Sequence, residues 1–151
     1  MQFDHEGWQA ALATSIADVL CEFRPAAGDE MASFAVDCHP WHGIIALAFL
    51  TSPEATADPP LRDPTEMAAW RFYDFQASLA GWRPAVALAS AMLAASTGSG
   101  EGRREVAQRF LRGCAVAVAS DAVRRELARY RLADGFAVTV PHPDTGEEIK
   151  S

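Results

Sequence analysis

Residues 32–51 read ASFAVDCHPWHGIIALAFLT, and this stretch decides the fold. From Ala32 to Cys38, larger apolar side chains alternate with small or polar ones. An alternation with a period of two residues is typical of a strand with one buried face. Ile44 to Thr51 form a second, more continuously apolar run. The five residues HPWHG that separate the two runs are a suitable length for a hairpin loop. The stretch therefore predicts an antiparallel hairpin whose second strand is central in a sheet.

A helix is predicted before the hairpin. Asp4 is a suitable N-cap, and large apolar residues follow at intervals of three and four. They are Trp8, Leu12, Ile16, Val19, Leu20 and Phe23. We expect this helix to end near Arg24 and Pro25, with a turn over residues 26–30.

Two more helices are predicted after the hairpin. Residues 52–63 contain three prolines and read as a surface connection, and Asp63-Pro64-Thr65-Glu66 then has the composition of a helix start. We expect that helix to continue to Trp82, and an alanine-rich helix to occupy residues 85–96. An alanine-rich helix of this kind is buried on several sides or packs against a partner. Residues 97–102 are rich in glycine and serine and are expected to be flexible.

The last third of the chain is less clear. Residues 103–132 favour a helix, although Gly113 and Ser120 could divide it and residues 115–119 could instead form a strand. Residues 136–140 alternate and predict a further strand. Taken together, residues 1–140 are expected to be a single α+β domain with a small, mainly antiparallel sheet of about three strands. Four or so helices should cover one face of it as a single layer, and residues 141–151 should form a polar tail.

Composition and charge narrow the class of protein. The formal net charge of −7 is uneven, because residues 1–82 carry 12 acidic and 3 basic side chains while the remainder has a small basic excess. The N-terminus lacks the pattern of an export signal, and three widely spaced cysteines suit reduced thiols. Arginine outnumbers lysine 12 to 1. We expect a cytoplasmic protein with no membrane association. The excess of arginine over lysine favours a bacterial source.

The densest polar cluster lies at the hairpin turn. Asp37, Cys38, His39 and His42 offer four potential metal ligands within six residues. A small metal-dependent hydrolase built on these residues is therefore one hypothesis, with Asp37, His39 and His42 as the first ligands to consider. Cys38 shares the apolar face of its strand with Val36, which favours an inward, structural cysteine. No complete catalytic set is recognisable, and no cofactor is expected.

Aromatic residues suggest a different function. Five aromatics fall within residues 70–82, and Trp and Tyr are frequent anchors in protein interfaces. Trp41, Trp70 and Tyr73 are the candidate partner-binding residues. Together with the acidic first half of the chain, they favour a non-enzymatic bacterial interaction module, of adaptor or immunity type, that binds a protein partner or itself as a dimer.

Nucleic-acid binding is the third hypothesis. Eight arginines lie within residues 103–131, but acidic residues alternate with them and their helical spacing scatters them around the axis. No recognition motif accompanies them. A solvated helix face is the better interpretation.

Overall fold

The computed structural model describes residues 3–57, 65–98 and 102–151. It confirms the predicted hairpin: strand β1 (Met31–His39) pairs antiparallel with β2 (Ile44–Thr51). The short 3-10 helix η1 (Pro40–His42) joins them and ends at Gly43, which has a φ of 66°. Such a φ is costly for other residues, because a Cβ atom crowds the neighbouring backbone. The hairpin therefore depends on glycine at this position.

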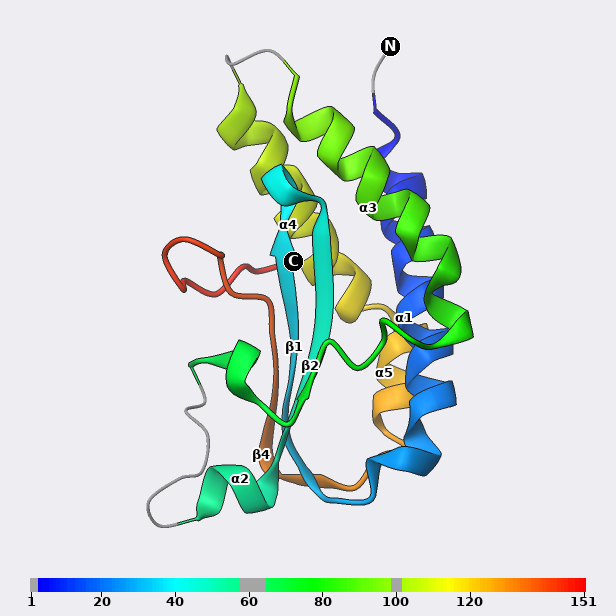
Figure 1. Cartoon of the computed structure of the whole chain (residues 1–151), viewed down its shortest axis with the longest axis vertical. Coiled ribbons are helices and arrows are strands. Elements are labelled where there is room, and N and C mark those ends of the chain that lie inside the picture. Colours follow the sequence, from blue (N-terminus) through cyan, green and yellow to red (C-terminus); the bar gives the residue numbers. More distant parts are fainter. Residues whose placement is uncertain (1–2, 58–64, 99–101) are drawn as a thin grey trace.

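Four strands form one sheet within the described residues, in the order β3-β2-β1-β4 (Figure 1). Strand β3 (Phe72–Tyr73) pairs antiparallel with β2, while β4 (Leu132–Thr139) pairs parallel with β1. The predicted α+β class with a mainly antiparallel sheet is confirmed, although the last strand begins earlier than expected. Its pairing with β1 shifts register between Leu132 and Ala137, and Gly135 within this irregular part has a φ of 78°.

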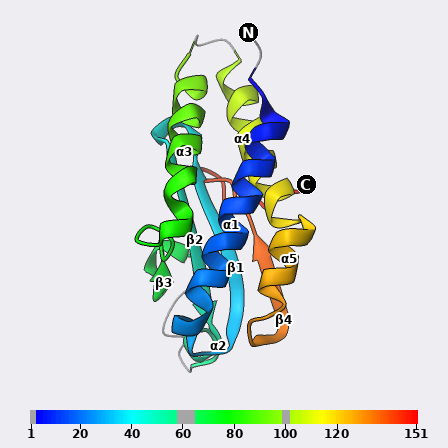
Figure 2. The same ribbon diagram turned by 90° about the vertical axis from the view of Figure 1, so that its right-hand side faces the viewer.

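A single layer of helices covers one face of the sheet (Figure 2). It consists of α1 (His5–Ala27), α3 (Arg83–Ser96), α4 (Arg103–Val118) and α5 (Asp121–Leu127). The short helix α2 (Ser52–Thr56) follows β2 at one end of the sheet instead. The main core lies between this layer and the strands, where Phe34, Leu47 and Phe49 meet the apolar side of α1.

The first helix agrees with its sequence pattern. The side chain of Asp4 accepts a hydrogen bond from the backbone N–H of Gly7 at 2.9 Å, as expected of an N-cap. The helix continues slightly beyond Pro25, to Ala27, although Pro25 has no N–H to donate to the carbonyl of Cys21 four residues earlier. Gly28 follows with a φ of 72° and ends it.

The last helical region is divided into two helices. Ser120 is the N-cap of α5, and its hydroxyl accepts a hydrogen bond from the backbone N–H of Val123 at 3.4 Å. Residues 115–118 are helical, so the alternative of a strand there is wrong. Gly113 lies inside α4 where a Cβ atom would be 3.0 Å from the Trp8 ring, and this glycine therefore lets α1 and α4 pack closely.

The expected helix from Pro64 to Trp82 is wrong. Residues 65–79, which we call the strap, contain only the 3-10 turn η2 (Met67–Ala69) and the two-residue strand β3, and a second 3-10 turn, η3 (Ala80–Trp82), follows. Its proposed cap at Asp63-Pro64 lies outside the described residues, as do residues 99–101 of the expected flexible segment.

The strap departs from helix because its aromatic residues pack on both faces of the sheet. We call the face opposite the helices the outer face. Trp70 packs there over Ala35, Ala48 and Leu50, whereas Phe75 contacts the main core. A single helix could not present side chains to both faces of one sheet. Hydrophobic periodicity alone does not reveal this division.

Candidate functional site

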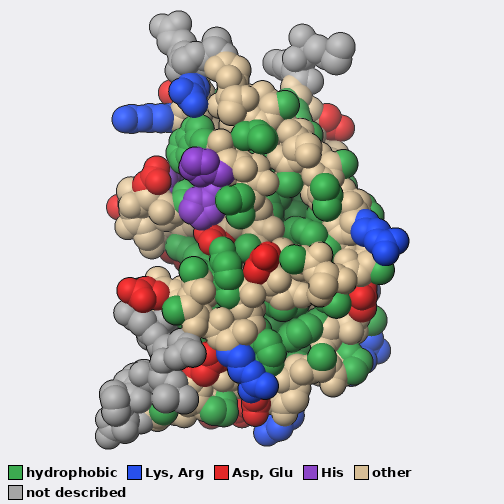
Figure 3. Space-filling model, viewed as in Figure 1, with side chains coloured by type: hydrophobic (Ala, Val, Ile, Leu, Met, Phe, Trp, Pro, Cys, Tyr) green, Lys and Arg blue, Asp and Glu red, His purple; other side chains and the backbone are tan. Residues whose placement is uncertain are grey.

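Asp37, His39 and Tyr73 form a polar cluster on the outer face. Asp37 and His39 are alternate residues of β1, so both side chains lie on this face. The Nε2 atom of His39 lies 2.8 Å from Oδ1 of Asp37, and the hydroxyl of Tyr73 donates to Oδ2 at 2.7 Å. Ala46 is the cross-strand partner of Asp37, and its small side chain leaves room for Tyr73 to reach across β2. Histidine side chains gather on the side of the molecule shown in Figure 3.

This geometry makes Asp37 a supporting carboxylate. Its side chain is only 12% exposed, and a buried carboxylate is costly unless its oxygens are hydrogen-bonded. His39 and Tyr73 satisfy one oxygen each, which fixes the orientation of all three side chains. The cluster therefore joins the strap to the sheet and holds the His39 ring in place.

Cys38 lies on the other side of the same strand, as its alternation predicts. Its thiol is buried in the main core, 3.6 Å from the sulfur of Met92. A hydrogen bond with Cys114 and burial raise the pKa of the Cys38 thiol well above its ordinary value. Cys38 thus remains a thiol in the core and does not join His39 as a nucleophile or metal ligand.

His42 approaches His39 but does not enter the cluster. Its side chain is exposed, and the two imidazole ring centroids are 6.3 Å apart. Within residues 3–57, 65–98 and 102–151, no three His, Cys, Asp or Glu side chains are placed to hold one metal ion. Among the described residues, the structure therefore does not bring Asp37, His39 and His42 together as a set of three ligands.

The three aromatic candidates lie in different environments. Trp41 is part of η1 and is partly exposed, and Tyr73 uses its hydroxyl to bind Asp37. Trp70 is only 5% exposed and covers the outer face. Trp70 therefore offers little surface to a partner, and the aromatic-rich segment mainly serves packing.

Alkaline pH should report on the Tyr73 contact. Burial, followed by the hydrogen bond to Asp37, raises the pKa of Tyr73 above its ordinary value; burial also raises the pKa of Tyr130, the only other tyrosine. Both tyrosines ionise in the unfolded chain near pH 10 but stay protonated when folded. The free energy of unfolding should thus decrease as pH rises above about 10, since the unfolded state binds fewer protons.

Tyr73→Phe tests this assignment by denaturant unfolding at pH 7 and at several values above pH 10. The variant should lose about 1–2 kcal/mol at pH 7 through its missing hydrogen bond, and show a weaker decrease at high pH than the native chain. An unchanged pH dependence would contradict the raised pKa of Tyr73.

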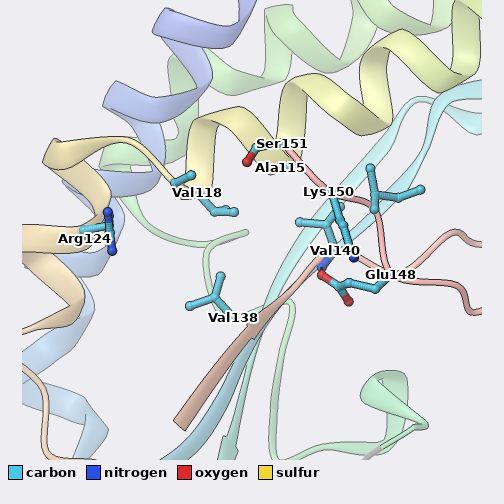
Figure 4. Close-up of a pocket in the computed structure, with 10 residues that line it drawn as sticks. Ala115, Val118, Arg124, Val138, Val140, Glu148, Lys150 and Ser151 are labelled. Carbon is cyan, nitrogen blue, oxygen red and sulfur yellow. Dashed lines mark hydrogen bonds between the residues drawn. The ribbon is translucent and has the colours of Figure 1, made fainter.

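An apolar groove lies on the helical side of the sheet, beside the edge strand β4 (Figure 4). Its volume is about 630 Å³, which is within the range of ligand pockets. Val118 of α4 and Val138 of β4 lie on its two sides, with Arg124 at one end and Lys150 at the other. It is lined by Ala115, Val118, Ala119, Arg124, Val138, Val140, Glu148, Ile149, Lys150 and Ser151.

The C-terminal residues complete this groove. The backbone N–H of Ile149 donates to the carbonyl of Val140 at 2.9 Å, and the N–H of His142 donates to the carbonyl of Glu147 at 2.7 Å. The segment expected to be a polar tail thus turns back on itself, and the Ile149 side chain is buried in the main core. No isolated sequence motif marks the groove, because four separate segments within residues 115–151 form it.

The arginines of the last helical region are spread over separate surfaces. Arg104, Arg109 and Arg112 border a shallow hollow on α4 together with Glu105, while Arg124 and Arg125 border another with Asp121. Each group includes an acidic side chain, as expected of a solvated helix face. The basic charge is therefore not gathered into one stripe.

No match to the chain was found among protein-family models, curated proteins or solved structures. In the described part of the chain, none of the helices combines the length and apolar character required to cross a bilayer.

Proposed function

We propose that the chain is a non-enzymatic protein-interaction module of adaptor or immunity type in the bacterial cytoplasm. Its binding site is the groove beside β4, and its ligand is an extended apolar segment of a partner protein. The groove is the observation that carries this function, since apolar surface beside a strand edge suits an extended peptide.

The edge of β4 supports this choice of ligand. Strand β4 is last in the sheet order, and within the described residues no strand pairs with its other edge. Natural edge strands are usually protected by bulges or charges, and here Asp134 and the irregular pairing around Gly135 lie only in the first half of β4. The second half, which includes Val138, is regularly paired with β1 on one side and lies beside the groove.

The character of the lining specifies the ligand further. Val138 is 37% exposed, although its side chain lies on the face of β4 that is turned toward the helical layer. Arg124 and Lys150 lie at the two ends of the apolar centre. Glu148 is also part of the lining, at the Lys150 end, so Arg124 is the basic side chain without an acidic lining residue beside it. A segment with apolar residues in its centre and an acidic residue that reaches Arg124 therefore has the complementary chemistry.

Val138→Asp tests the function. A library of random phage-displayed peptides selected on the native chain should yield apolar, acid-flanked sequences. Synthetic copies of them should bind the Val138→Asp variant about 30-fold more weakly, which corresponds to about 2 kcal/mol for a central contact. Titration calorimetry measures the affinities.

Val86→Asp is the matched control. Val86 is 60% exposed on α3, away from the groove, so the same substitution there should leave peptide affinity unchanged. Thermal unfolding should confirm that both variants fold. Failure to select any peptide, or equal binding to both variants, would refute the assignment. A concentration-dependent dimer that Val138→Asp dissociates would assign the groove to a second copy of the chain instead.

A further inference from the structure

The outer-face cluster leaves one nitrogen of His39 without a role. The Nε2 atom of His39 faces Asp37, so in a neutral imidazole Nε2 carries the proton and donates it to the carboxylate. The other nitrogen, Nδ1, is then an unprotonated acceptor. A carboxylate that orients a histidine in this way is the usual second layer of a metal site, where it fixes the ring and increases the basicity of the other nitrogen.

His42 supplies a second imidazole near His39. With metal–nitrogen distances of about 2.1 Å, the ring centroids of two histidines on one tetrahedral ion lie about 5.3 Å apart. From the observed 6.3 Å, the two rings must approach each other by about 1 Å to share an ion. His42 is exposed at the end of η1, so its ring is not held in the observed position by a packed core.

We propose that His39 and His42 together bind a divalent transition-metal ion such as Zn²⁺, with Asp37 and Tyr73 as supporting residues outside the coordination shell. Asp37 is buried between His39 and Tyr73, which explains why it is not itself available as a ligand. Two imidazoles leave the remaining positions of the ion to water or to a group from outside the chain.

The ligand chemistry determines which ions fit. Neutral imidazole suits Zn²⁺, Cu²⁺ and Ni²⁺, whereas Mg²⁺ and Ca²⁺ prefer oxygen ligands. The site is therefore expected to bind Zn²⁺ and not Mg²⁺. It is separate from the groove beside β4, so the failure of either assignment leaves the other unaffected.

Calorimetric titration of the untagged chain with ZnCl₂ tests the site. One equivalent of Zn²⁺ should bind; His39→Ala and His42→Ala should each abolish or strongly weaken binding. Asp37→Asn should weaken it about 10- to 100-fold, as expected when a supporting carboxylate is lost. The chain has two other histidines, so His5→Ala and His142→Ala are matched controls that should keep native affinity. MgCl₂ should give no binding heat.

Tryptophan fluorescence gives a second readout. Trp41 lies between the two ligands in η1 and is partly exposed, whereas Trp8, Trp70 and Trp82 are buried. Quenching by Cu²⁺ should therefore disappear in Trp41→Phe while the Zn²⁺ affinity of that variant is retained. Zn²⁺ binding that survives both His39→Ala and His42→Ala, or the absence of any Zn²⁺ binding to the folded native chain, would overturn the assignment.

Discussion

Phe49→Ala is expected to lower the free energy of unfolding by about 3–5 kcal/mol, the usual cost of truncating a buried phenylalanine. Phe49 is fully buried in β2. Its ring centroid lies 5.0 Å from that of Phe34, 4.9 Å from Tyr130, 5.3 Å from Phe75 and 6.2 Å from Phe23. These neighbours come from β1, the segment after α5, the strap and α1. The cavity would therefore lie where four parts of the chain meet and cannot collapse through one local shift.

Urea unfolding followed by circular dichroism measures this loss. Phe136→Ala is the matched control, because Phe136 in β4 is only partly buried and should cost less than half as much. Since domains of this kind are stable by only about 5–15 kcal/mol, the Phe49→Ala variant should remain folded but unfold at much lower urea. A loss below about 1 kcal/mol would show that the ring does not join these parts.

The elements predicted correctly are those that carry a clear local sequence pattern, whether or not their partners lie close in sequence. The hairpin follows from the alternation around Val36 and the glycine-ended turn at Gly43, and α1 follows from its apolar face and the Asp4 cap. In each case one local pattern determines both the backbone and the buried side. The strap has no such pattern, because its aromatics are divided between two faces that only the finished sheet creates.

The polar side chain of Gln76 illustrates why the strap was predicted wrongly. Gln76 is almost fully buried, and its amide accepts from the backbone N–H of Leu47 at 2.9 Å and donates to the carbonyl of Ile45 at 3.3 Å. It thus continues the hydrogen bonding of β2 in place of a strand. In the sequence, no local signal around Gln76 shows that its side chain satisfies a strand edge.

The candidate sites also differ in whether a local sequence pattern determines them. The proximity of Asp37 to His39 follows from strand alternation, but the role of Tyr73 requires the strap to cross β2. The groove was not predicted at all. It depends on the angle between α4 and β4 and on the return of Ile149 to the core, and each of its apolar residues is unremarkable alone.

Glu54 should have the second large effect on stability, because its buried carboxylate joins the strap to the end of β2. One oxygen, Oε2, accepts from the backbone N–H and the hydroxyl of Thr51, at 3.0 and 2.7 Å. The other, Oε1, accepts from the backbone N–H of Arg71 at 2.9 Å. The Thr51 hydroxyl also accepts from the Glu54 N–H, which completes a capping box for the five-residue helix α2.

Glu54→Gln replaces one of these acceptors by a donor. The amide NH₂ group of the glutamine then faces the backbone N–H of either Thr51 or Arg71, and two donors cannot form a hydrogen bond. The expected loss of unfolding free energy is about 2–4 kcal/mol. Hydrogen exchange should accelerate at the Arg71 amide and through the strap, while amides in the middle of α1 keep most of their protection.

Glu66→Gln is the control for this experiment, since Glu66 belongs to the strap itself but is exposed and should change stability by less than about 0.5 kcal/mol. If Glu54→Gln instead raised exchange equally in α1 and the strap, the strap would not open separately from the core. If it changed neither stability nor exchange, the Glu54 contacts would contribute nothing to holding the strap. Selective opening would also uncover Trp70 and the outer face beside Asp37, because Trp70 is the side chain that covers Ala35, Ala48 and Leu50.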